Sequence, residues 1–254
     1  MSDKKISEIT AELKSIADDE LDEFIAEYVK DGRPGVGKLV GQANKRLEKL
    51  RLERLRLEEM RFFEHKYSDE FSYICGIDEA GRGPLVGPVV AGAVVLPADC
   101  EILYLNDSKK LSEKKRDELY DEIMEKAIAV GVGFSTPARI DEINILQATY
   151  EAMKTAINSM SVSPDILLND AVTIPGINVK QVPIIKGDAK SVSIAAASII
   201  AKVTRDRYME EMDKKYPEYG FAKHKGYGTA EHIAALKKYG PCSEHRRSFI
   251  GNFI

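Results

Sequence analysis

The 254-residue sequence has no tryptophan, only three cysteines, and no apolar run long enough to cross a membrane. A membrane-spanning helix needs about 20 predominantly apolar residues, and the nearest candidate, residues 191–203, is too short and is followed by Arg205. The amino-terminal segment also lacks the apolar core of a secretory signal. Cys75, Cys100 and Cys242 are too few and too widely spaced for a disulfide framework or a zinc site. We therefore expect free thiols in a cytoplasmic protein.

The sequence also lacks an excess of basic residues, and its formal net charge of −4 argues at first against a nucleic-acid partner. The charge is unevenly distributed, however. Residues 1–31 contain ten acidic and four basic residues, whereas residues 38–62 contain eight basic and four acidic residues. The first segment alone is more negative than the whole chain, so the remainder carries a net positive charge. The acidic average therefore does not exclude a polyanionic partner.

Both charged segments carry apolar residues at spacings of three and four, which is typical of amphipathic helices. Glycines and a proline between residues 31 and 37 separate them. We expect a helical extension over residues 1–70, in which the helices either pack on the following domain or present a basic arm to nucleic acid. Residues 32–38 resemble a phosphate-binding P-loop, but Leu39 stands where that motif requires Ser or Thr.

Residues 71–254 have the charge density of a globular domain, and short apolar runs alternate there with helical patterns. Strands are predicted at residues 73–77, 88–96, 128–135, 165–169 and 179–184. Helices are predicted at residues 111–127, 140–160, 191–214 and 229–238. A strand pair followed by alternating helices and strands favours an α/β domain with one mixed sheet flanked by helices.

The strongest local motif is the pair Asp78 and Glu79, which follows strand 73–77 and precedes the Gly-Arg-Gly triplet at 81–83. We expect the backbone to bend after the strand so that both carboxylates reach one site. Two such charges repel, and a divalent cation offsets them better than one arginine does. A dinucleotide-binding loop is excluded, because Val86 replaces its third glycine and the two acids would repel a pyrophosphate.

Three further acids lie near the ends of predicted elements. Asp170 follows a buried strand, Asp188 precedes a helix rich in Ala and Ser, and Asp107 lies in a turn. Taken singly, Asp188 would be interpreted as a helix N-cap and Asp107 as a turn or cap residue. Asp78, Glu79, Asp170 and Asp188 together supply the oxygen ligands that Mg²⁺ or Mn²⁺ prefers. Two such ions can activate a water and stabilise the leaving oxygen in phosphodiester hydrolysis.

Basic clusters accompany these acids along the sequence. They comprise Lys109, Lys110, Lys114, Lys115 and Arg116; Lys202, Arg205 and Arg207; Lys223 and Lys225; and Arg246 and Arg247. Each cluster alone is typical of a solvated surface. Around an acidic metal site, the clusters together fit the phosphate backbone of a nucleic acid.

These motifs resemble those of type 2 ribonuclease H, also called ribonuclease HII, and they are spread over most of residues 71–250. The matching stretches are GIDEAGRGPLVGPVVAGAVVL from Gly76, DSKKLSEKKR from Asp107, KGDAKSVSIAAASIIAKVTRDRYM from Lys186, HKGYGT from His224 and GPCSEHRRSF from Gly240. The resemblance implies an RNase H-like fold with a five-stranded mixed sheet in residues 71–254. It also implies an enzyme that cuts RNA in RNA–DNA hybrids and incises 5′ of single ribonucleotides in duplex DNA, leaving 5′-phosphate and 3′-OH ends. We separately expect the enzyme to be a monomer.

The resemblance further implies a role for each residue of the motifs. The metal ligands would be Asp78, Glu79, Asp170 and Asp188, and the residues that contact the substrate would be Gly81, Arg82, Gly83, Lys109, Lys110 and Tyr227. The Gly-Arg-Gly triplet would sense the ribose 2′-OH and the adjoining phosphate, and Tyr227 would stack at the junction between ribonucleotide and deoxynucleotide. Ala171 stands where many family members have Gly, so the turn after Asp170 is expected to differ.

Two alternatives remain at this point. A type 3-like ribonuclease H would cut continuous hybrids and spare a lone ribonucleotide, and a binding module without activity would turn over no substrate. The charged helical extension and the Lys186-Gly-Asp motif favour type 2 over type 3. The intact set of four acids argues against a binding module.

Overall fold

The computed structural model describes residues 3–254 of the chain, which forms two compact units, Met1–Glu58 and Glu59–Ile254. The three cysteines are free thiols, as the sequence predicts. Among the described residues, no helix combines the length and the hydrophobicity that a bilayer crossing requires.

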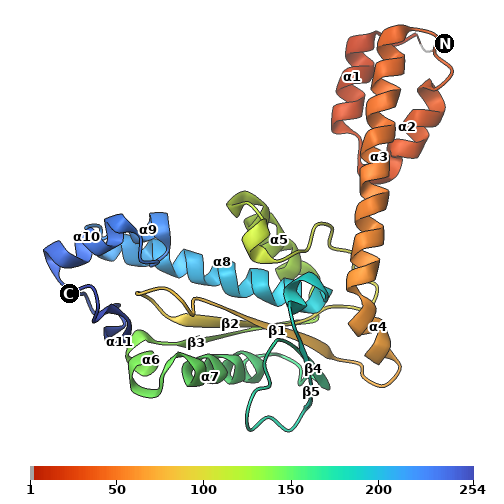
Figure 1. The fold of residues 1–254 in the computed structure, drawn as a ribbon. Helices are drawn as coiled ribbons and strands as arrows, with labels where there is room; N and C mark the ends of the chain where they lie inside the picture. Colours follow the sequence, from red (N-terminus) through yellow and green to blue (C-terminus); the bar gives the residue numbers. More distant parts are fainter. Residues whose placement is uncertain (1–2) are drawn as a thin grey trace. The chain divides into compact units, whose positions relative to one another are not determined.

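The first unit is helical, as predicted, but it contains three main helices where the charge pattern predicts two. These are α1 (Ile6–Ser15), α2 (Leu21–Tyr28) and α3 (Pro34–Met60), with a short 3₁₀ helix η1 (Asp18–Glu20) before α2 (Figure 1). The acidic segment is divided because the chain becomes extended at Ile16 and Ala17. Helix α3 begins inside the predicted breaker cluster, because Pro34 in the first turn needs no backbone N–H partner there.

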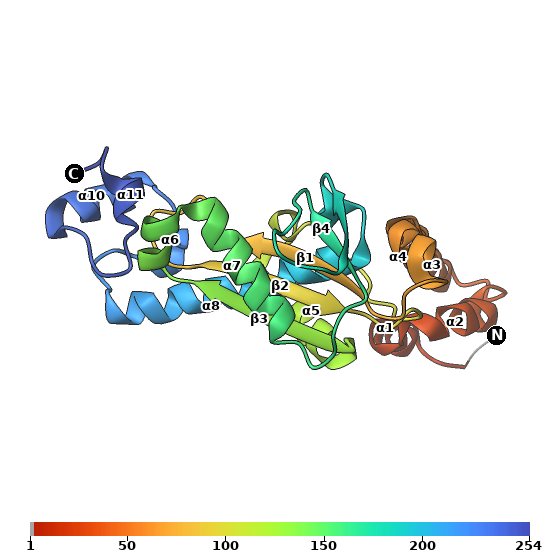
Figure 2. The ribbon, with the colours of Figure 1, turned by 90° about the horizontal axis from the view of Figure 1, so that it is seen from below.

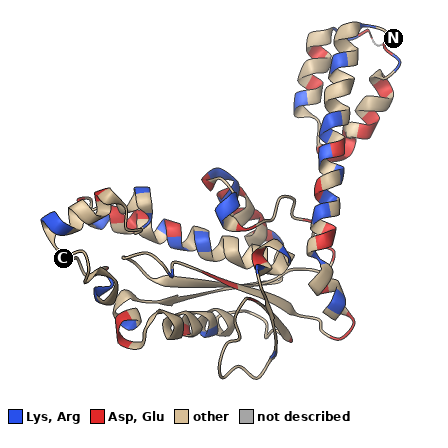
Figure 3. Ribbon diagram, in the orientation of Figure 1, with Lys and Arg blue, Asp and Glu red and all other residues tan. Residues whose placement is uncertain are grey.

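The acidic and basic segments of this unit pack against each other. Ile9, Leu21 and Tyr28 are fully buried in its small apolar core. At the surface, Arg46 of α3 forms an ion pair with Asp18 and donates a hydrogen bond to the Ile16 carbonyl at 3.1 Å. Figure 3 shows how densely Lys, Arg, Asp and Glu are distributed along these helices. Part of the opposite charge noted in the sequence is therefore paired within the unit.

The second unit is built on a five-stranded mixed sheet, which confirms the predicted fold class. Its strands are β1 (Ile74–Ala80), β2 (Val89–Val95), β3 (Ala129–Ser135), β4 (Ile166–Asp170) and β5 (Lys180–Ile184), in the spatial order β3-β2-β1-β4-β5. Strands β1, β2 and β3 pair antiparallel, whereas β4 pairs parallel to both β1 and β5. The carboxyl ends of β1 and β4 therefore lie at the same edge of the sheet.

Helices cover both faces of the sheet (Figures 1 and 2). The helices of this unit are α4 (Phe62–Ser68), α5 (Glu113–Lys126), α6 (Pro137–Ile143), α7 (Ile145–Asn158), α8 (Val192–Lys215), α9 (Phe221–His224), α10 (Ala230–Tyr239) and α11 (Arg247–Ile250), with 3₁₀ helices η2 (Ser108–Lys110) and η3 (Gly187–Ala189). Helix α7 packs on one face and α8 on the other. The helix predicted at 140–160 is interrupted at Asn144, which has a φ of 71° and whose side chain caps α7.

The close approach of α8 to β1 positions the site described below. A Cβ atom at Gly76 would lie only 2.0 Å from the carbonyl carbon of Ser193, so a larger residue would push α8 off the sheet. Residues two apart on a strand share a face, and Asp78 is therefore on the side of the sheet that α8 covers. Its partner in the β1–β2 register is Gly92. The packing of α8 thus brings the turn η3 to Asp78.

Candidate metal-binding active site

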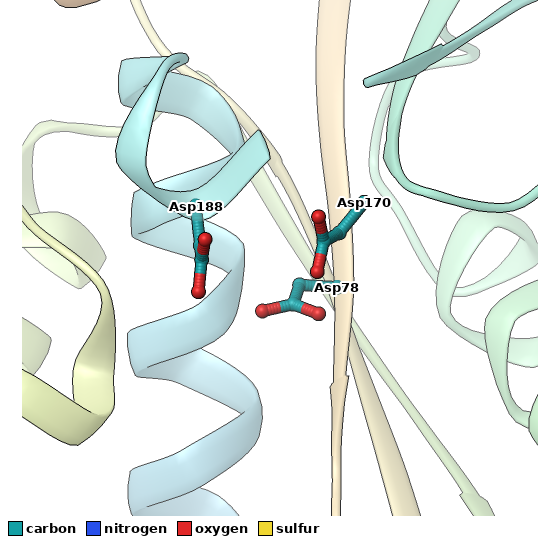
Figure 4. Close-up of side chains that lie close together, drawn as sticks. All are labelled: Asp78, Asp170 and Asp188. Carbon is teal, nitrogen blue, oxygen red and sulfur yellow. The ribbon is translucent and has the colours of Figure 1, made fainter. Parts of the chain in front are cut away.

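Three aspartates from separate elements meet at the carboxyl edge of β1 and β4. Asp78 lies on β1, Asp170 ends β4, and Asp188 lies in η3, immediately before α8. One carboxylate oxygen of each lies within 4.8 Å of the others. Figure 4 shows the three side chains directed toward one another. The parallel register explains part of this arrangement, because Ile77 pairs with Asn169 and the next residues on the two strands are the aspartates.

The turn that carries Asp188 is held by its neighbours. Asp170 Oδ1 accepts a hydrogen bond of 2.7 Å from the Gly187 N–H, so the second aspartate positions the turn of the third. The N-cap interpretation of Asp188 is wrong, because Ser191 caps α8 by accepting from the Ile194 N–H at 3.2 Å. Asp107 is a cap, as its turn position predicts, and accepts from the Lys109 N–H at 2.9 Å.

Glu79 lies beside this cluster rather than within it. The expectation that the strand ends before the acid pair is wrong, since β1 continues to Ala80 and keeps both acids in the ladder with β2. Strand alternation then separates the two side chains, and the Glu79 carboxylate instead forms an ion pair of 3.2 Å with Arg82. It remains close enough to influence the ionisation of Asp78.

The electrostatics of the cluster favour a bound cation. Burial, together with the charges of Glu79 and Asp170, raises the pKa of Asp78 well above its ordinary value. Burial and the charge of Asp107 raise the pKa of Asp188 in the same way, and burial raises that of Glu79 against the opposing charge of Arg82. Several carboxylates that are costly to ionise together form an oxygen-rich site that suits a hard divalent ion. The donor set therefore fits Mg²⁺ or Mn²⁺.

A cavity of about 280 Å³ adjoins this cluster. Its lining residues are Glu79, Ala80, Gly81, Arg82, Gly83, Ser108, Lys109, Lys202, Arg205 and Tyr227. It gathers most of the substrate-contacting residues that the resemblance implies, although they come from distant parts of the chain. Tyr227 is 49% exposed, and its ring lies 3.8 Å from the position that a Cβ atom on Gly83 would occupy. Lys110 is exposed and does not line the cavity.

Two of the basic residues that the sequence groups with solvated clusters are buried. Arg205 is 1% exposed and Arg246 is completely buried, so the interpretation of their clusters as solvated surface is wrong for both. Ser108 and Lys202 also line the cavity, and sequence reasoning missed Ser108 as a site residue. The only sequence signal for Ser108 was its place between Asp107 and Lys109 in the matching motif.

The fold and the acidic cluster together define a metal-dependent nuclease of the RNase H-like class. The family model described as Ribonuclease HII matches residues 75–252, and the model described as Ribonuclease HII N-terminal domain matches residues 5–68. The chain belongs to the ribonuclease HII family. The helical extension, which precedes the motifs that carry the resemblance, is thus matched by a family model of its own.

Similar proteins cover nearly the whole chain. A ribonuclease HII from Lachnoclostridium phytofermentans is 62% identical over 98% of this chain and 97% of its own. One from Clostridioides difficile is 52% identical over 100% of both chains. Among solved structures, the ribonuclease H2 from Pyrococcus horikoshii superposes with a TM-score of 0.58 at 32% identity, covering 69% of this chain and 92% of that one. The protein is therefore a metal-dependent endoribonuclease that acts on RNA in RNA–DNA hybrids.

Proposed function

We propose that the enzyme, besides cutting RNA in RNA–DNA hybrids, incises duplex DNA on the 5′ side of a single embedded ribonucleotide. The products would carry 5′-phosphate and 3′-OH ends, and two Mg²⁺ or Mn²⁺ ions would support the reaction. The observation that carries this proposal is the juxtaposition of the acidic cluster with the cavity formed by residues 81–83 and Tyr227. One end of that arrangement suits catalytic ions, and the other suits a ribose and its phosphate.

In this proposal Asp78, Asp170 and Asp188 bind the ions directly, and Glu79 completes the ligand set from the adjacent side. When bound, the ions activate a water and stabilise the leaving oxygen of an in-line displacement. The Gly187 N–H fixes the Asp170 carboxylate, which leaves its second oxygen available as a ligand. Lys109 supplies positive charge beside the acids. Partial burial opposes its charge, but Asp107 and Asp78 raise the pKa of Lys109 and keep it protonated.

The other end of the cavity is suited to a ribonucleotide. Glycine backbone can approach a sugar closely, and its N–H and C=O groups match a 2′-hydroxyl, which both donates and accepts hydrogen bonds. The half-exposed ring of Tyr227 stands next to Gly83, and stacking on an aromatic ring contributes about 1–3 kcal/mol without reading base sequence. These features favour recognition of one ribose over recognition of a long hybrid.

We further propose that the enzyme works as a monomer in the cytoplasm. The acids and the cavity residues all come from one chain, which supports a complete site in each molecule. Free thiols and a nucleic-acid substrate are consistent with the cytoplasmic location.

A related structure is that of a PCNA:RNase HII complex from Archaeoglobus fulgidus, which is 28% identical over 71% of this chain and 96% of that one, with a TM-score of 0.58.

The test uses purified protein, Mn²⁺ or Mg²⁺, and a labelled DNA duplex containing one ribonucleotide. We expect a single nick 5′ of that nucleotide, no cutting of the all-DNA duplex, and no cutting in EDTA. Cleavage of a continuous hybrid with sparing of the lone ribonucleotide would instead identify a type 3-like specificity. The variant Asp78→Asn should lose cleavage and keep most of its affinity for the duplex, and loss of affinity would contradict the role given to Asp78.

A further inference from the structure

The loop between β1 and β2, residues 81–88, contains the Gly-Arg-Gly triplet and is held from beneath by two buried arginines. Arg246 precedes α11 and is completely buried. Its guanidinium donates to the carbonyls of Gly81 at 2.6 Å and Arg82 at 2.9 Å. It also donates to the Gly87 carbonyl from two nitrogens, at 2.9 and 2.7 Å. One side chain thus connects the start and the end of the loop.

The direction of these carbonyls determines the direction of the next amide groups. The peptide bonds of the loop are trans, and in a trans peptide the C=O of one residue and the N–H of the next point in opposite directions. Because the Gly81 and Arg82 carbonyls point to Arg246, the N–H groups of Arg82 and Gly83 point away from it. Among residues 3–254, neither N–H donates to another backbone group. Both residues line the cavity beside the acids.

Arg205 of α8 supports the same loop from a second direction. It donates to the carbonyls of Pro88 at 3.1 Å and Val86 at 3.0 Å, and to that of Lys225 at 2.9 Å. The last contact connects the loop to the segment that carries Tyr227. Gly81 has a φ of +92°, and a Cβ atom there would lie 2.1 Å from the Arg205 Nε. Glycine is therefore required at position 81 for two reasons: the turn needs a positive φ, and a side chain would clash with the buried Arg205.

The charges of the two arginines are offset only from beyond ion-pair distance, by Asp206 for Arg205 and by Asp141 for Arg246. In the part of the chain that the structure describes, neither guanidinium lies within ion-pair distance of an acidic side chain. The backbone carbonyls satisfy their donors instead. Burial and the charge of Arg205 lower the pKa of Arg246 to about 9, so it remains protonated near neutral pH. Burying an unpaired charge is costly, and two positive charges beneath the loop favour an anion on its outer side.

We propose that Arg246, supported by Arg205, is a positioning residue that presents the N–H groups of Arg82 and Gly83 to the ribonucleotide and its adjoining phosphate. The proposal rests on the ribonucleotide-incising function proposed above. In this role neither arginine contacts the substrate. Both arginines hold the loop by binding its carbonyls, and Arg246 binds the carbonyls of the two peptide units that contain the Arg82 and Gly83 N–H groups.

The test compares Arg246→Lys with its parent, both in the Asp78→Asn background so that bound duplexes are not cut. Lysine keeps the charge but lacks the planar fork that reaches three carbonyls at once. Affinity is measured for two duplexes that differ only in one ribonucleotide. We expect the preference for the ribonucleotide duplex to fall about tenfold, the effect of losing one charge-assisted hydrogen bond. The matched control is Arg61→Lys, because Arg61 donates to the carbonyls of Ala98 and Cys100, away from the loop.

The outcomes separate the inference from the proposed function. An unchanged preference in Arg246→Lys, with the parent clearly preferring the ribonucleotide duplex, would overturn the inference alone. A parent without any preference would overturn the proposed function and the inference with it. If Arg246→Lys does not fold, amide NMR of the Asp78→Asn protein provides the test. The Arg82 and Gly83 signals must shift more with the ribonucleotide duplex than with the all-DNA duplex, and equal shifts would overturn the inference.

Discussion

Replacing Asp78 by Asn should abolish cleavage and at the same time stabilise the metal-free protein. The reason is the mutual repulsion of the acids, whose carboxylate oxygens lie within 4.8 Å of one another while Asp78 is only 4% exposed. Asparagine has the same size and removes the charge. Its amide oxygen can keep the 2.7 Å hydrogen bond that Asp78 Oδ1 accepts from the Glu79 N–H. The substitution therefore removes repulsion without opening a cavity.

The magnitude follows from Coulomb's law. At an effective dielectric constant of about 20, two unit charges about 5 Å apart repel by roughly 3 kcal/mol, and Asp78 faces two neighbours of the cluster. Solvent and partial protonation of the acids reduce this repulsion, so we expect a gain of about 1–3 kcal/mol in the free energy of unfolding. In a domain of this size, each kcal/mol raises Tm by roughly 2–4 °C.

The assay is thermal unfolding in EDTA, repeated with Mn²⁺. The wild-type protein should unfold at a lower temperature than Asp78→Asn in EDTA and should gain more from Mn²⁺. The control is Asp141→Asn, because Asp141 accepts hydrogen bonds from the Arg247 N–H at 2.7 Å and the Ser248 N–H at 2.9 Å and does not belong to the aspartate cluster. That variant should be less stable than wild type. A Tm for Asp78→Asn at or below wild type in EDTA would refute the reasoning.

Three further predictions concern the same unit. The raised pKa values of Asp78, Glu79 and Asp188 favour the protonated acids in the folded state. The metal-free protein should therefore lose stability as pH rises from about 4 through those values, while the Mn²⁺-induced increase in Tm grows; a pH-independent increase would contradict this. Ala171 has a φ of 56°, which glycine adopts more easily than alanine. Ala171→Gly should therefore raise the free energy of unfolding, measured by urea denaturation, by up to about 1 kcal/mol and leave cleavage unchanged. Glu64 accepts hydrogen bonds from the Ser191 Oγ at 2.5 Å and the Ser193 N–H at 3.0 Å. Glu64→Ala should lower the free energy of unfolding, measured in the same way, by about 1–3 kcal/mol, and Glu64→Gln should lower it by less.

The positions of the strands and helices of the second unit could be predicted closely, because each follows from a local pattern of apolar residues. The helix predicted at 191–214 is α8 at Val192–Lys215, and the strand predicted at 179–184 is β5 at Lys180–Ile184. For the elements that were predicted, the errors lie at their ends and at interruptions. The break at Asn144 depends on a single residue with a positive φ within an otherwise helical pattern, which periodicity does not reveal.

The short helices α4, α9 and α11 were not predicted from the sequence. Each has seven residues or fewer, too few for a periodic pattern to emerge. Helix α4 nevertheless carries Glu64, which caps the start of α8 through Ser191 and Ser193. That contact joins residues more than 120 positions apart, and nothing in the local sequence around Glu64 indicates it.

By itself the sequence determined the kind of chemistry, because side chains with oxygen donors at strand ends and glycines after a strand restrict what a site can bind. It also determined the mixed sheet, which follows from the order of strands and helices. Only the tertiary structure decided that Glu79 lies beside the three aspartates rather than among them, and that Ser191 caps α8. It likewise decided that Arg205 and Arg246 lie inside the protein. Burial and hydrogen-bond partners depend on which distant segments pack together, and a basic residue has the same local sequence signature whether it meets solvent or backbone carbonyls.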